Sequence, residues 1–127
     1  GLVAWTPERL FTLFPNLGEM PDRPGGSMSG GEQQMLTVAR TLMGNPLLVM
    51  LDEPSEGVAP VIVEQMAHMI MNLKQQGLAI LLSEQNLHFA QLVCDRAYVL
   101  EQGQIRFADS MQALAANEEV QQAYLSL

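Results

Sequence analysis

The sequence is poor in cysteine and in basic side chains. Cys94 is the single cysteine, so no disulfide can form within the chain, and a reducing compartment is the simpler setting. Lysine and arginine together number 6 against 14 acidic residues, which gives a formal net charge of −8. Because nucleic-acid binding needs a basic face, this balance argues against nucleic acid as the main partner. Apolar runs stay well short of the roughly 20 residues that a membrane-spanning helix needs.

The chain does contain enough apolar residues to build a folded core. Its length of 127 residues, 48% of them hydrophobic, fits one domain or part of one. The first residue is not methionine, and we expect the chain to begin inside a longer protein.

Apolar spacing and turn residues predict alternating helices and strands. Two short apolar runs, 47–51 and 78–83, are typical of strands buried on both faces of a parallel sheet. The stretch 15–27 is rich in proline and glycine and is expected to be a loop, and 96–108 is expected to be a β-hairpin. A strand, a crossover helix and a second strand predict an α/β fold. The predicted helices begin at or near Thr6 and Pro7, Ser29, Pro60, Asn86, and Asp109 and Ser110, with Thr6 expected to cap the first of them.

Two carboxylates, Asp52 and Glu53, directly follow the first predicted strand. In open α/β sheets the carboxyl ends of the strands form the edge where ligands bind. Mg²⁺ suits two acids there because it prefers oxygen ligands. Asp52 would then hold the metal, and Glu53 would polarise an attacking water as a general base. The alternative is that the two acids merely begin a solvated loop, and the pair alone favours neither interpretation.

The segment Ser29-Gly30-Gly31-Glu32 stands at the start of a predicted helix. The N–H groups and the dipole of a helix N-terminus attract anions, and two glycines let the backbone approach a phosphate closely. The alternative is an ordinary capping box, in which Ser29 caps the helix and Glu32 reaches back to the cap. Capping is the more common arrangement, and the segment alone favours it.

Taken together, "MSGGEQQ" and "LLVMLDEPS" closely resemble the signature and Walker B motifs of the ATPase domain of ABC transporters. The resemblance continues through "VAPVIVEQM" and "LLSEQN" to the hairpin and the final "AYL". "LDEPSEGVAP" and "SEQN" are most similar to branched-chain amino acid importers and to the related urea and amide importers. The resemblance implies a partial P-loop NTPase fold, with a mostly parallel sheet, crossover helices, a C-terminal hairpin and helices. Residues 1–28 would be the tail of the helical subdomain, and residues 29–127 the C-terminal part of the ATPase core.

The resemblance implies that the signature contacts ATP held by the opposite subunit of a head-to-tail dimer. Ser29, Gly30 and Gly31 would contact its γ-phosphate through the hydroxyl and the backbone N–H groups. The resemblance also places Glu32 in this nucleotide-binding segment, although many members have glutamine there and its own role is not defined.

The same resemblance assigns the remaining half-site. Asp52 matches the Mg²⁺-linked acid, Glu53 the catalytic base, and Ser55 the start of the D-loop. Gln85 occupies the switch position, which is usually histidine, and it can donate a hydrogen bond to the γ-phosphate but cannot become cationic.

The Walker A motif, Gly-x-x-x-x-Gly-Lys-Ser/Thr, does not occur in the sequence, whose only lysine is Lys74. We therefore expect the isolated chain to bind ATP poorly and to hydrolyse it negligibly. The resemblance also places the missing P-loop strand between strands 78–83 and 96–101. Because both would expose unpaired edges, we expect this piece to be oligomeric, rearranged or structurally incomplete.

The implied parent is a cytoplasmic ATPase on the inner face of the plasma membrane, using ATP and Mg²⁺. Its partners would be a second ATPase subunit, membrane permease subunits and, indirectly, an extracellular or periplasmic solute-binding protein, but no nucleic acid. Two alternatives are a DNA-repair or chromosome-type ABC ATPase and a non-catalytic interaction module that retains the fold. Acidic charge and the absence of coiled-coil heptads oppose the first, and intact Asp52 and Glu53 oppose the second.

Overall fold

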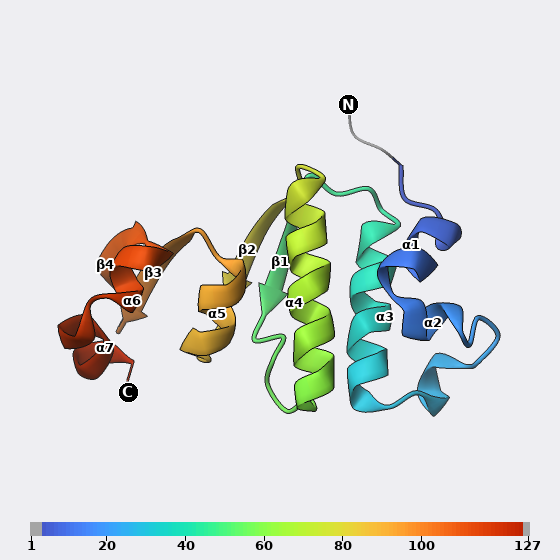
Figure 1. Cartoon of the computed structure of the whole chain (residues 1–127), viewed down its shortest axis with the longest axis horizontal. Helices are drawn as coiled ribbons and strands as arrows, with labels where there is room; N and C mark the ends of the chain where they lie inside the picture. Colours follow the sequence, from blue (N-terminus) through green and yellow to red (C-terminus); the bar gives the residue numbers. More distant parts are fainter. Residues whose placement is uncertain (1–3, 126–127) are drawn as a thin grey trace. The chain divides into compact units, whose positions relative to one another are not determined.

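A computed structural model describes residues 4–125 (Figure 1). They divide into two compact units, one ending at Ser83 and the other beginning at Glu84.

The first unit combines helices with a parallel pair of strands. The Thr6 hydroxyl caps its first helix by accepting a hydrogen bond from the Arg9 N–H, and proline occupies the first helical turn. Its elements are α1 (Pro7–Leu13), α2 (Pro15–Gly18), the 3₁₀ turn η1 (Gly25–Ser27), α3 (Gly30–Leu42), β1 (Leu48–Asp52), α4 (Pro60–Gln75) and β2 (Ala79–Ser83).

The prediction that 15–27 is a loop is wrong at both ends, because the short helix α2 and the turn η1 form there. Pro15 occupies the first turn of α2, where its missing N–H costs nothing. Leu17 is buried and anchors this helix to the core. Tertiary burial thus orders a stretch whose composition is typical of loops.

β1 and β2 pair in parallel, and α4 is the crossover between them, as predicted. The register runs from Leu48 opposite Ala79 to Asp52 opposite Ser83. The carboxyl ends of the two strands are therefore level, so Asp52 lies beside the last residue of β2.

The prediction that both strands are buried on both faces is wrong. Along β1, Val49 is only 2% exposed, whereas its neighbours Leu48 and Met50 are 49% and 71% exposed. Leu81 of β2 is 55% exposed. Since side chains alternate along a strand, one face of the pair is covered and the other is open within the described part of the chain.

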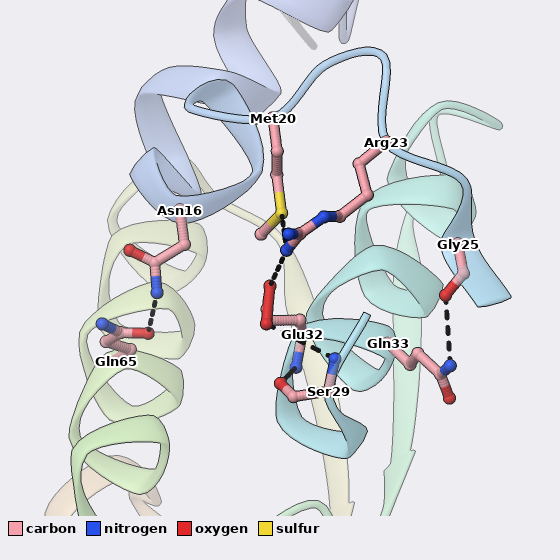
Figure 2. Close-up of polar contacts among 8 residues, drawn as sticks. All are labelled: Asn16, Met20, Arg23, Gly25, Ser29, Glu32, Gln33 and Gln65. Atoms are coloured by element: carbon pink, nitrogen blue, oxygen red, sulfur yellow. Dashed lines mark hydrogen bonds and ion pairs between the residues drawn. The ribbon is translucent and has the colours of Figure 1, made fainter. Parts of the chain in front are cut away.

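The core of the first unit lies largely along α3 and α4. Both helices carry apolar stripes at helical spacing, as the sequence predicts. Their buried residues are Met35, Val38, Ala39 and Leu42 on α3 and Met66, Met69, Ile70 and Leu73 on α4. Polar contacts add to this packing: Asn16 of α2 donates a hydrogen bond to Gln65 of α4 over 3.1 Å (Figure 2).

The second unit contains α5 (Leu87–Val93), β3 (Arg96–Glu101), β4 (Gln104–Ser110), α6 (Met111–Ala115) and α7 (Glu118–Tyr124). β3 and β4 form the predicted antiparallel hairpin. Gln102 and Gly103 at its turn both have positive φ, 50° and 74°, as tight hairpin turns require. Asp109, predicted to begin a helix, instead belongs to β4, and Ser110 caps α6.

A small apolar cluster holds the second unit together. Its buried members are Ala90 of α5, Val99 of β3, and Met111 and Leu114 of α6.

The described strands form two separate two-stranded sheets, so β2 and β3 belong to different sheets. The oligomeric state expected from open strand edges stays a prediction.

Candidate functional site

The Ser29 end of α3 forms a complete capping box (Figure 2). The Ser29 hydroxyl accepts a hydrogen bond from the Glu32 N–H over 3.2 Å. In return, the Glu32 carboxylate accepts one from the Ser29 N–H over 3.4 Å. The capping box, which the sequence analysis gave as the alternative to a phosphate site, is therefore present. Capping uses the Glu32 N–H, and Ser29 itself remains exposed.

Glu32 has a second partner on the segment that leads into α3. The Arg23 guanidinium lies 4.0 Å from its carboxylate and also donates a hydrogen bond to the Met20 sulfur over 3.4 Å (Figure 2). Half of the Arg23 side chain is exposed, so this ion pair adds little to stability. Glu32 therefore has two local contacts. These contacts explain the presence of an acid at this position, and no bound ligand is needed to explain it.

The two glycines of the segment differ in their surroundings. A Cβ atom on Gly30 would meet nothing within 4 Å, so the backbone there is open to a ligand. Gly31, in contrast, lies directly against Ile62 of α4. First-turn N–H groups have no carbonyl partner within their own helix, so this open backbone fits an anion such as a phosphate oxygen.

Asp52 and Glu53 stand at the tip of β1, in different conformations. Asp52 is the last residue of the strand and is exposed. Glu53 is half-buried and has a φ of 47°, in the left-handed region that residues with a side chain rarely adopt. Its N–H donates a 2.6 Å hydrogen bond to the Ser83 carbonyl of β2. An unusual backbone angle held by strong contacts is frequent at functional sites.

A side chain of α3 reaches the loop that follows these acids. The Gln34 amide donates a 2.6 Å hydrogen bond to the Pro54 carbonyl. In Figure 1 the β1 arrow points toward the lower end of the first unit, where α3 and α4 both begin. The structure thus brings the signature segment and the Asp52–Ser55 loop to one end of this unit.

Gln85 lies in the second unit, two residues before α5 begins. Its side chain is exposed, and its N–H donates a 3.1 Å hydrogen bond to the Glu84 carboxylate. The same carboxylate accepts the Asn86 N–H, and Asn86 in turn caps α5. The residue predicted for the switch position is thus on an ordered turn between β2 and α5.

The Asp52 carboxylate is suited to supply one ligand of a Mg²⁺ ion whose other ligands come from water and substrate phosphates. Within residues 4–125, no three His, Cys, Asp or Glu side chains gather as a metal cluster. An exposed Asp52 oxygen is nevertheless the ligand type that Mg²⁺ prefers, and this ion commonly completes its shell with water and substrate phosphates.

Among the described helices, none has the length and hydropathy needed to cross a bilayer.

Comparison with known proteins identifies the family. The model of the ABC transporter family matches residues 8–56, a span that includes Ser29 and Glu53. The chain is also 47% identical over 118 residues to BraG of Pseudomonas aeruginosa, a high-affinity branched-chain amino acid transport ATP-binding protein. The chain belongs to the ABC transporter ATP-binding family. The recognition made from the two sequence motifs is confirmed.

Other members of this ATP-binding family show the same relationship. LptB of Escherichia coli, a lipopolysaccharide export system ATP-binding protein, is 34% identical over 110 residues, which cover 87% of this chain and 46% of LptB. The BraG match covers 93% of this chain and 51% of BraG. The chain therefore spans about half the length of these relatives.

Solved ABC ATPase structures confirm the predicted fold class. The crystal structure of an ATP-binding cassette of an ABC transporter in its ADP conformation matches with a TM-score of 0.79 at 28% identity. That match covers 94% of this chain and 50% of the cassette.

Sequence reasoning missed the contact of Gln34 with Pro54 and that of Ile62 with Gly31. Both residues contact segments far along the chain, and neither stands out by residue type. The available signal was their position: Gln34 follows the signature segment on the same helix, and Ile62 lies in the first turn of α4.

Proposed function

We propose that this chain is the signature-to-switch portion of an ATP-hydrolysing subunit that energises solute import. The solute is a branched-chain amino acid or a similar small polar molecule such as urea or an amide. The observation that carries this proposal is the 47% identity to BraG, against 34% to LptB. The net charge of −8 opposes the DNA-repair or chromosome-type alternative, because DNA binding requires basic surface.

The site residues take the following roles in this proposal. Ser29, Gly30 and Gly31 contact the γ-phosphate of an ATP molecule bound mainly by another subunit. The open backbone at Gly30 supports this, since no side chain obstructs an approaching anion. Glu32 supports the segment from within through its capping contact with Ser29.

The tip of β1 supplies the hydrolytic half-site. Asp52 holds Mg²⁺, which when bound neutralises charge on the phosphates. Glu53 orients and polarises the attacking water, Ser55 begins the loop that reaches the other subunit, and Gln85 donates a hydrogen bond to the γ-phosphate. The level ends of β1 and β2 support the roles of Asp52 and Glu53, because ligands bind at the carboxyl ends of the strands in open α/β sheets.

The partners follow from this division of the site. A second ATPase subunit in a head-to-tail dimer supplies the phosphate-binding loop opposite Ser29. Permease subunits hold the dimer on the cytoplasmic face of the plasma membrane, and a solute-binding protein outside delivers the solute to them.

A hybrid protein tests the proposed function. The matching segment of BraG is replaced by this chain, and leucine uptake is measured in Pseudomonas aeruginosa cells that lack BraG. We expect uptake well above that of cells carrying the same hybrid with Glu53→Gln. A parallel LptB hybrid in Escherichia coli depleted of LptB is expected not to restore lipopolysaccharide export. Restored export without restored uptake would refute the import assignment.

A further inference from the structure

We propose that Gln34 is a positioning residue, which holds the loop after β1 and thereby sets the orientation of Glu53. This inference rests on the proposed function, because Glu53 is the base only if the chain belongs to a hydrolysing subunit. The structural part, that Gln34 holds the loop, can be tested independently of hydrolysis.

The contact itself is short and partly shielded. The Gln34 Nε2 group donates to the Pro54 carbonyl oxygen over 2.6 Å, between residues 20 positions apart in sequence. Pro54 is buried and Gln34 is half-buried. A hydrogen bond shielded from water is stronger than an exposed one, so this side chain is a firm attachment for the loop.

The loop needs such an attachment because its backbone is unusual. Glu53 has a φ of 47°, and Gly57 four residues later has a φ of 72°. On the β2 side the Glu53 N–H donates to the Ser83 carbonyl, and within the loop the Glu56 N–H donates to the Glu53 carbonyl over 3.2 Å. Gln34 adds an attachment on the α3 side. Two adjacent residues are thus held from opposite sides, Glu53 by β2 and Pro54 by α3.

Gln34 also connects two functional segments of the same chain. It lies on α3, whose N-cap Ser29 begins the signature segment. In a head-to-tail dimer that segment and Glu53 serve different ATP molecules. A displacement of α3 when Ser29 contacts phosphate is therefore transmitted through Gln34 to the loop that carries the base of the other site.

The neighbouring residue Gln33 provides a matched control. Its Nε2 group donates to the Gly25 carbonyl over 3.1 Å, toward the segment before α3 (Figure 2). Gln34→Glu and Gln33→Glu each remove an amide donor and add one negative charge on the same helix. The two variants differ in which loop is released.

Hydrogen exchange on the 127-residue chain tests the structural part. We expect Gln34→Glu to speed exchange of the hydrogen-bonded Glu53 and Glu56 amides by about three- to tenfold, the factor that one net hydrogen bond represents. Gln33→Glu is expected to leave these amides within about twofold of the unsubstituted chain. Equal exchange at these amides in both variants would overturn the proposal.

Kinetics of the BraG hybrid test the effect on Glu53. Because ATP is bound mainly by groups outside this chain, we expect Gln34→Glu to lower kcat by about tenfold with KM for ATP within about twofold. Gln33→Glu should change neither. Faster exchange with unchanged kcat would show that Gln34 holds the loop without setting the base, and this would overturn the proposal. If the unsubstituted hybrid hydrolyses no ATP, the proposed function fails, and the exchange result still decides whether Gln34 holds the loop.

Discussion

A Cβ atom added to Gly31 would lie 2.9 Å from Cγ1 and 3.0 Å from Cγ2 of Ile62. Real Cβ atoms essentially never come that close to another heavy atom, and the side chain of isoleucine is stiff near its backbone. The first turn of α3 thus packs on α4 without room for a side chain. Gly31 has a packing role here in addition to any contact with phosphate.

Gly31→Ala is therefore expected to destabilise the chain by about 1–3 kcal/mol, the cost of overpacking a tight contact. Gly30→Ala is the matched control, because a Cβ there would meet nothing within 4 Å. Urea unfolding followed by circular dichroism measures both. Adding Ile62→Ala to Gly31→Ala should remove part of the extra cost. Equal midpoints for the two glycine variants would contradict the packing role.

Variants of Ser29 separate its capping role from its proposed contact with phosphate. Ser29→Ala should cost about 1 kcal/mol of stability because the cap is lost. Ser29→Asp should retain stability, since aspartate also caps, but its negative charge should repel a phosphate. We expect the aspartate variant of the BraG hybrid to lose most of its ATPase activity. Full activity would show that Ser29 only caps α3.

The left-handed backbone at Glu53 should make glycine a more stable replacement there than alanine. Because its φ is 47°, Glu53→Gly should give a chain about 1 kcal/mol more stable than Glu53→Ala gives. Both replacements should abolish hydrolysis by the hybrid. Glu56 is the control position, since its φ is not positive, and there alanine should be the more stable replacement. The same order at both positions would argue against strain at Glu53.

The isolated chain should not turn over Mg-ATP, because it contains no Walker A motif and its single lysine is Lys74 of α4. Phosphate release from the chain is expected to match that of the Glu53→Gln variant. Release that depends on Glu53 would show that the described residues suffice for hydrolysis and would remove the need for a second subunit.

Much of this fold could be predicted from local sequence. Thr6 and Ser29 cap helices as expected, and Gln102-Gly103 closes the hairpin, since caps and tight turns depend on neighbouring residues. The exposed face at Met50 could not be predicted, because an apolar run does not show whether another segment covers it. The left-handed φ of Glu53 and the bond from Gln34 to Pro54 likewise arise from tertiary contacts.

The two sheets differ in the separation of their strands along the chain, and this sets the order in which they should fold. The hairpin closes over Gln102 and Gly103 alone, and such hairpins form in about 1–10 μs. Pairing of β1 with β2 must first bring together strands separated by residues 53–78, which include all of α4. Since closure of longer segments costs more entropy, we expect β3 and β4 amides to gain protection before those of β2 when the chain refolds.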